Sequence, residues 1–230
     1  MPVVTDFHTL ELKPLFYQLT PEELVHLNTL LHRQTFPAGA TILTAEQPGE
    51  VVYFIDRGAV KIHLEQMDGT DVILAILAAG DVLGEMGLMD AAARSASAIT
   101  LEETVLWWME RTAFQQCLKT IPQMAYNLLQ LLSQRLRMAN EQIQALATKD
   151  VEGRIARQLV ALVNSYGQQT VTGDWYIPIR LTQSDLASFV GATRERVNQV
   201  MASYKQRNYL SVDKSYHLTI HNLDAVTKML

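Results

Sequence analysis

The stretch Leu181–Val200 reads LTQSDLASFVGATRERVNQV, which predicts two short capped helices joined by a tight turn. Thr182 is placed to cap the first helix and Thr193 the second, because a threonine oxygen accepts a hydrogen bond from a free N–H of the first turn. Gly191 lies between them and permits a backbone conformation that a residue with a Cβ adopts only at a cost. Two short helices joined by a tight turn in this order predict a helix-turn-helix.

The second helix is predicted to bury one face and to expose the other. Its apolar residues recur at helical spacing: Val197, Val200, Met201 and Tyr204. Arginine donates two parallel bonds to guanine, glutamate accepts from cytosine, and asparagine or glutamine pairs with adenine. The candidate DNA-binding residues are Thr182, Gln183, Thr193, Arg194, Glu195, Arg196, Asn198 and Gln199. The pattern predicts sequence-specific binding to double-stranded DNA, although two short helices with a glycine turn also occur in proteins that bind no DNA.

The segment that follows, Tyr209–Ile220, reads YLSVDKSYHLTI and is rich in β-forming residues. The polar run from Asp213 to Ser215 interrupts it, which is the pattern of a small hairpin. A hairpin directly after a recognition helix is a wing. Lys205, Arg207 and Lys214 lie around it and are expected to contact DNA phosphates, which positions the domain without reading sequence.

The charge of the chain divides unevenly. The 230 residues exceed one typical domain, and a hydrophobic content of 48% is enough for two cores. From Asp150 onward nine Lys and Arg face seven Asp and Glu, a net charge of +2, whereas Met1–Lys149 carries −7. An acidic N-terminal part joined to a mildly basic C-terminal part suits a sensor attached to a DNA-binding module.

Several classes of protein are excluded by what the sequence lacks. The longest apolar runs fall far short of the ~20 residues of a membrane-spanning helix, and Met1–Leu10 lacks the basic start and apolar core of a signal peptide. We therefore expect a cytoplasmic protein without a membrane partner. The single cysteine, Cys117, is expected to be a half-buried thiol. It excludes a disulfide framework and a four-cysteine iron–sulfur or zinc site within one chain, and His63 is better explained as a strand residue than as a haem ligand.

The N-terminal half is punctuated by glycine at near-regular intervals, with short β-branched or aromatic runs between them. Such runs, with turns every ~8–12 residues, indicate an antiparallel roll or barrel. Thr20-Pro21-Glu22-Glu23 ahead of them is a helix start with a capping box. The expected fold class is α+β. It has a jelly-roll-like antiparallel β-roll with flanking helices in residues 1–120, a long dimerisation helix in 121–149, and a winged helix-turn-helix in 150–230.

Within the expected roll, Gly80–Ser97 reads GDVLGEMGLMDAAARSAS, and Arg94-Ser95 follows the pair Gly84-Glu85, with Arg94 nine positions after Glu85. This spacing resembles the phosphate-binding cassette of cyclic-nucleotide-binding domains. A cyclic phosphate needs a guanidinium fork and hydroxyl or backbone donors, and a ribose hydroxyl needs an acceptor such as Glu85. The expected ligand residues here are Gly84, Glu85, Met86, Arg94 and Ser95. Ala91-Ala92-Ala93 replaces the turn with Gly and Pro that is usual before the arginine, which should alter the loop without removing its ligands.

Residues 121–149 are predicted to form one long helix with a narrow apolar stripe. Its members alternate at spacings of three and four: Leu129, Leu132, Leu136, Ala139, Ile143 and Leu146. A stripe sustained over almost three heptads is better explained by a parallel two-helix dimer than by packing on a globular core, which is the alternative.

Nearly the whole chain, from about Leu15 to Ile220, resembles the CRP/FNR family, and Asp150–Ala156 matches the family's hinge pattern D-V-x-G-R-I-A. The resemblance implies a homodimeric transcription regulator gated by a ligand, with cAMP as the first expectation and RNA polymerase as a possible partner. Ala139 and Asn140 occupy the positions that contact the purine. Arg194 and Glu195 occupy those of the guanine and cytosine readers. The two DNA half-sites of an inverted repeat should lie about 34 Å apart.

Other readings of the sequence stay open. A branch of the family that binds 2-oxoglutarate keeps the roll, and a ligand-independent regulator would use the roll only as a dimerisation scaffold. A nucleotide hydrolase with Glu85 as its base is the rival from another class. We do not expect an enzyme, because the chain contains no H-E-x-x-H, G-x-S-x-G or C-x-x-C motif.

Overall fold

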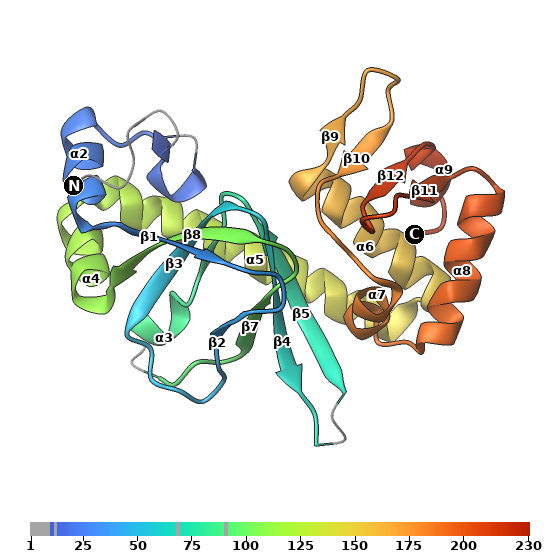
Figure 1. Ribbon diagram of the computed structural model, residues 1–230, viewed down its shortest axis with the longest axis horizontal. Helices are drawn as coiled ribbons and strands as arrows, with labels where there is room; N and C mark the ends of the chain where they lie inside the picture. Colours follow the sequence, from blue (N-terminus) through green and yellow to red (C-terminus); the bar gives the residue numbers. More distant parts are fainter. Residues whose placement is uncertain (1–9, 12, 68–69, 90–91) are drawn as a thin grey trace. The chain divides into compact units, whose positions relative to one another are not determined.

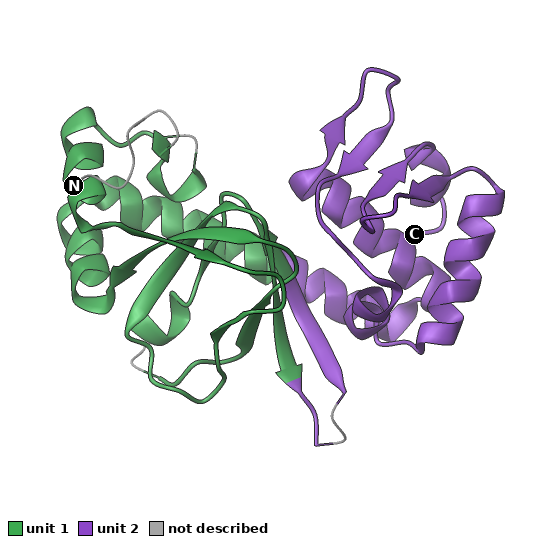
Figure 2. Cartoon of the chain, in the orientation of Figure 1, with its two compact units in different colours: residues 1–64, 76–137 green, residues 65–75, 138–230 purple. Residues whose placement is uncertain are grey.

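A computed structural model describes residues 10–11, 13–67, 70–89 and 92–230 (Figure 1). The chain divides into two compact units, residues 1–64 with 76–137 and residues 65–75 with 138–230 (Figure 2). Nine of the ten residues tested for a signal peptide, 1–9, lie outside the described part, as does Ala91 of the expected cassette. No helix in the described part is both long and apolar enough to cross a membrane.

The strands between residues 32 and 110 form two four-stranded antiparallel sheets, so the predicted β-roll is confirmed. One sheet has the order β1-β8-β3-β6 and the other β2-β7-β4-β5. The strands are β1 (His32–Phe36), β2 (Thr41–Leu43), β3 (Val51–Arg57), β4 (Ala59–Glu65), β5 (Asp71–Ala78), β6 (Val82–Leu83), β7 (Ser97–Thr100) and β8 (Thr104–Glu110). Strands distant in sequence pair in both sheets, which brings the segment after β6 and the segment before β7 into one part of the roll (Figure 1).

Helices cover one side of this roll. They are η1 (Pro14–Phe16), α2 (Pro21–Leu30), α4 (Arg111–Thr120) and α5 (Pro122–Thr148), with the short α3 (Met86–Met89) between β6 and β7. The predicted capping box at α2 is confirmed, because Thr20 accepts from the backbone N–H of Glu23 and the Glu23 carboxylate accepts from that of Thr20. Phe54 of β3, Phe114 of α4 and Leu128 of α5 belong to one buried cluster. Burial of this apolar surface is the main stabilising term for the unit.

Cys117 corrects one expectation. Its side chain lies in the buried cluster of α4 and is 1% exposed, whereas a half-buried thiol was predicted. The apolar face of α4 repeats every three to four residues, so Phe114 and Cys117 lie on the same buried side.

The second unit contains a four-stranded antiparallel sheet, of order β11-β12-β10-β9, together with the C-terminal part of α5 and the helices that follow it. Its elements are α6 (Val151–Tyr166), β9 (Gln168–Gln169), β10 (Trp175–Ile177), α7 (Gln183–Val190), α8 (Arg194–Gln206), β11 (Leu210–Val212), β12 (Leu218–Ile220) and α9 (Leu223–Thr227). The predicted wing is the hairpin of β11 and β12. The hairpin of β9 and β10 was not predicted, because β9 consists of two glutamines and β10 of only three residues.

The helix-turn-helix forms as the sequence indicates. Thr182 caps α7 in a capping box with Asp185, and Thr193 caps α8 through the backbone N–H of Arg196. Gly191 ends α7 with a φ of 61°, a left-handed conformation that favours glycine. The predicted inner face of α8 is buried throughout: Val197, Val200, Met201 and Tyr204.

Candidate functional site

A cavity of about 90 Å³ lies in the first unit, at the segment between β6 and β7. All five residues expected there from the cassette pattern line it. The lining is Leu43, Ile62, Leu77, Leu83, Gly84, Glu85, Met86, Gly87, Arg94, Ser95, Ala96 and Arg135. The cavity is smaller than the ~300–1,000 Å³ of typical ligand pockets, so a molecule the size of a nucleotide enters only if side chains move.

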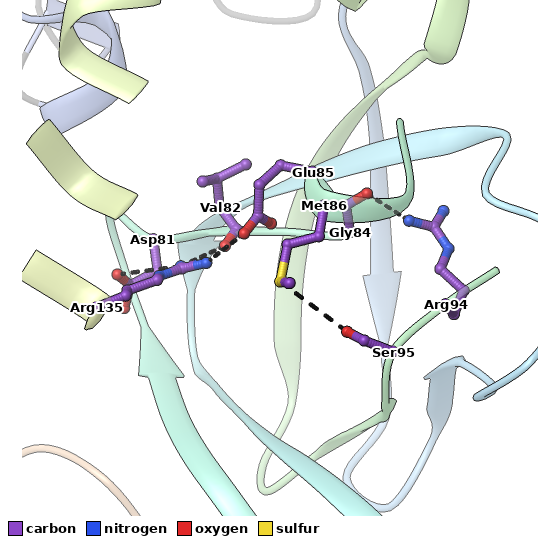
Figure 3. Close-up of polar contacts among 8 residues, drawn as sticks. All are labelled: Asp81, Val82, Gly84, Glu85, Met86, Arg94, Ser95 and Arg135. Carbon is purple, nitrogen blue, oxygen red and sulfur yellow. Dashed lines mark hydrogen bonds and ion pairs between the residues drawn. The ribbon is translucent and has the colours of Figure 1, made fainter. Parts of the chain in front are cut away.

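Arg94 is the buried cation of this cavity. The residue is 6% exposed, and its Nη1 and Nη2 donate to the backbone oxygens of Gly84 at 2.5 Å and Val51 at 2.6 Å (Figure 3 shows the first bond). Gly84 has a φ of +84°, and a Cβ there would lie 2.5 Å from Arg94 Nη1, so only glycine fits this close approach. Burial lowers the pKa of Arg94, and the neighbouring Tyr53 and Glu85 oppose that shift. The guanidinium is thus a buried positive charge held by neutral carbonyls, an arrangement that favours an anion.

Glu85 is buried beside Arg94 and forms an ion pair with a different arginine, Arg135. Its Oε1 accepts from Arg135 Nη1 at 2.7 Å, while Arg135 Nη2 donates to the Val82 oxygen at 2.5 Å and lies 3.9 Å from Asp81 Oδ1 (Figure 3). Arg135 comes from α5, so the long helix closes one side of the cavity. Arg135 was not among the predicted site residues. The available signal was an arginine on an amphipathic helix, four positions before Ala139 and on the same face.

Ser95 and Met86 face each other across the cavity. The Ser95 hydroxyl lies 4.0 Å from Met86 Sδ (Figure 3), and sulfur is a weak acceptor. The Met86 side chain is 53% exposed. A phosphate oxygen would therefore displace a weak partner from the hydroxyl, and Met86 has room to move.

Ala139 and Asn140 belong to the second unit and are exposed on α5. Four residues separate Arg135 from Ala139, about one turn of a helix. The predicted stripe on the same helix is also accessible at its heptad positions: Leu129, Leu136 and Ile143 are 63%, 64% and 64% exposed. Large apolar side chains at this spacing and exposure are typical of a surface that another helix covers.

The polar side of α8 is accessible at most of the predicted positions. Thr193, Arg194, Glu195, Arg196 and Gln199 are exposed. The Arg196 guanidinium donates to Gln199 Oε1 at 3.1 Å, which leaves the amide NH₂ of Gln199 for another acceptor. Asn198 differs from the expectation of a freely projecting side chain. It is half-buried, and its Oδ1 is buried without a hydrogen-bond partner among the described residues.

A groove of about 500 Å³ lies between α7, α8 and the wing. Predicted residues Thr182, Gln183 and Arg194 line it, together with Lys205 and Tyr216. Arg180 was not predicted, and its guanidinium lies 4.9 Å from the centre of the Tyr216 ring, a cation–π distance. Lys214, at the wing tip, is exposed. Hydroxyl, amide and cationic donors thus meet at one surface, as in proteins that hold DNA phosphates.

The described residues contain no group of three or more His, Cys, Asp or Glu side chains that could hold a metal ion.

A β-roll with a buried arginine and glutamate in its cavity, a long helix and a winged helix-turn-helix together define a DNA-binding regulator with a sensor domain. Comparison with known proteins agrees with this class. The model of the cyclic nucleotide-binding domain matches residues 33–121, and that of the Crp-like helix-turn-helix domain matches residues 153–229.

Two curated relatives extend the match over most of the chain. The chain is 33% identical to the CRP-like cAMP-activated global transcriptional regulator of Mycobacterium tuberculosis, over 86% of this chain and 88% of the relative. It is 30% identical to the cyclic AMP receptor protein of Thermus thermophilus, over 82% and 83%. The solved structure of FixK2 from Bradyrhizobium japonicum shares the fold, with a TM-score of 0.75, 21% identity and coverage of 86% and 96%. The chain belongs to the CRP/FNR family of transcription regulators, and it is a DNA-binding regulator and not an enzyme.

Proposed function

We propose that this regulator is a homodimer whose affinity for an inverted-repeat DNA site is set by a cyclic nucleotide in the cavity, with cAMP as the first candidate. The observation that carries the proposal is Arg94, a buried guanidinium held by two neutral carbonyls beside Glu85. The two curated relatives are named for cAMP, which supports this choice of nucleotide.

The chemistry of the lining fits a cyclic phosphate joined to a ribose. The single negative charge of a cyclic phosphodiester would neutralise Arg94, and the Ser95 hydroxyl would donate to a phosphate oxygen once Met86 moves away. Glu85 uses Oε1 for Arg135, so its Oε2 is the acceptor for a ribose hydroxyl. Hydrogen bonds to charged groups contribute about 1.5–3 kcal/mol each. Two such bonds from Arg94 would account for much of a micromolar affinity.

The dimer and the DNA site follow from the long helix and the second unit. The exposed heptad positions on α5 support a parallel two-helix dimer, with Ala139 and Asn140 available on the same helix to contact the base of the nucleotide. A two-fold dimer binds an inverted repeat, with one α8 in each of two successive major grooves. Contact with RNA polymerase rests on the family resemblance alone.

Calorimetric titration with cAMP, cGMP and cyclic di-GMP tests the proposed ligand. We expect one nucleotide to bind the wild type and to bind Arg94→Leu at least ~10-fold more weakly, because the charge-assisted bonds are lost. Arg57→Leu is the matched control, since Arg57 is an exposed arginine paired only at the surface with Glu103. Unchanged affinity in Arg94→Leu would refute the phosphate site.

A second candidate is the same DNA-binding dimer controlled by a smaller metabolite or by no ligand. The cavity volume of about 90 Å³ favours it. The same titration separates the two candidates: if no cyclic nucleotide binds the wild type, cyclic-nucleotide gating is refuted and the DNA-binding assignment is unaffected.

A further inference from the structure

Within the second unit, Arg157 of α6 contacts the C-terminal part of the long helix α5. Its Nη2 lies 2.9 Å from Glu141 Oε2 and donates to the backbone oxygen of Met138 at 3.2 Å. The Arg157 side chain is 16% exposed, whereas that of Glu141 is 64% exposed. An arginine that is largely buried and bonded to both a carboxylate and a carbonyl is held in one geometry, unlike most surface ion pairs.

Further contacts join the same end of α5 to the helix-turn-helix. Gln142 Nε2 donates to the backbone oxygen of Phe189 at 3.5 Å, in the last turn of α7. Leu146 Cδ2 lies 3.5 Å from the position of a Cβ on Gly191, the turn glycine. These contacts are apolar or long. Among these contacts, the Arg157 bridge is therefore the directional, charge-assisted one, and it links α5 to α6, which in turn contacts α7 and α8.

The helix that Arg157 holds also carries the arginine of the cavity. Arg135 lies three residues before Met138 on the continuous helix α5, and it holds Glu85 of the cassette at 2.7 Å. The Arg135–Glu85 ion pair and the Arg157 bridge thus lie within two turns of one helix. A ribose hydroxyl that bonds to Glu85 Oε2 shares the carboxylate with Arg135 and so changes the hold on Arg135, and a continuous helix passes a small displacement to its next turn.

We infer that Arg157 is a positioning residue for allostery: its bridge to Glu141 and the Met138 carbonyl makes α6 and the helix-turn-helix follow α5 when a ligand occupies the cavity. This inference rests on the proposed function. It concerns the coupling between the two sites, and neither site includes Arg157. Coupling between effector and target sites typically changes affinity by ~5–150-fold. Loss of the bridge should bring that factor close to one.

The test measures DNA affinity with and without cAMP, by fluorescence anisotropy, on a duplex that the wild type selects from a randomised library. The variants are Arg157→Ala, Glu141→Gln and the charge exchange Arg157→Glu with Glu141→Arg. The control is Arg57→Ala, which removes an arginine–glutamate pair of the same chemistry from the roll. Arg157→Ala should keep the wild-type affinity for cAMP alone within about twofold and lose most of the cAMP-induced gain in DNA affinity, while the charge exchange restores part of it.

A second readout needs no ligand. In the free protein, amide hydrogen exchange in Met138–Thr148 and in α6 should be faster in Arg157→Ala than in Arg57→Ala, because the bridge no longer closes these helices together. If cAMP has no effect on the wild type, the proposed gating fails, and the exchange experiment still decides the role of the bridge. Wild-type coupling in Arg157→Ala, or unchanged exchange in the two helices, would overturn the inference.

Discussion

Leu136 offers the most quantitative test of the proposed dimer. The side chain is 64% exposed and lies seven residues from both Leu129 and Ile143, which are equally exposed. Full burial of a leucine side chain contributes about 1.5–3 kcal/mol, so covering the exposed part of Leu136 contributes about 1–2 kcal/mol. A two-fold interface contains two copies. Leu136→Ala should therefore weaken the free energy of dimerisation by about 2–4 kcal/mol and raise the dimer dissociation constant roughly 30- to 1,000-fold.

Sedimentation equilibrium over a range of protein concentrations measures this constant directly. Alanine has the highest helix propensity, so the substitution should leave α5 intact, which circular dichroism checks. Gln144→Ala is the control, because Gln144 is an exposed polar residue on the same helix, outside the apolar stripe. Equal dissociation constants for Leu136→Ala and the wild type would show that this stripe does not form the dimer.

Two further predictions concern α8 and α4. Arg194→Ala should cost about 1–3 kcal/mol on the selected duplex and little on random DNA, as measured by anisotropy at fixed salt; equal losses on both would mean that Arg194 contacts only phosphate. Burial raises the pKa of the Cys117 thiol, so the folded protein should react slowly with iodoacetamide at neutral pH. As pH rises above the thiol's ordinary value, the unfolded state ionises first, and the free energy of unfolding should fall until the folded thiol also ionises. Rapid labelling of the folded protein would contradict the burial of Cys117.

The local features of the fold could be predicted because they depend on neighbouring residues. Thr182, Gly191 and Thr193 specify the ends of two helices through caps and a left-handed turn, and each does so in the structure. The regular glycines and β-branched runs indicate short antiparallel strands, because turns and strands also depend on residues that are close in sequence. The cassette residues meet in one cavity because their spacing matches a loop between two strands.

The contacts that depend on tertiary packing could not be predicted. The sequence places Glu85 and Arg94 in one cassette but does not give their protein partners: Glu85 binds Arg135, and Arg94 binds backbone carbonyls. Nothing in the sequence near Glu85 indicates a partner fifty residues away on another element. Asn198 is a second example. Helical spacing gives the direction of its side chain around α8 only approximately, and in the structure its amide oxygen is buried.

The faces of α5 separate dimerisation from coupling. Leu136 and Glu141 are five residues apart, which at about 100° per residue places them some 140° apart around the helix. Leu136 and the Arg157 bridge therefore use different faces of one helix. Leu136→Ala should weaken DNA binding most at low protein concentration, where dimers dissociate, whereas Arg157→Ala should act equally at all concentrations and only on the response to ligand. A single substitution that changed both properties together would mean that dimerisation itself, and not the bridge, transmits the signal to DNA.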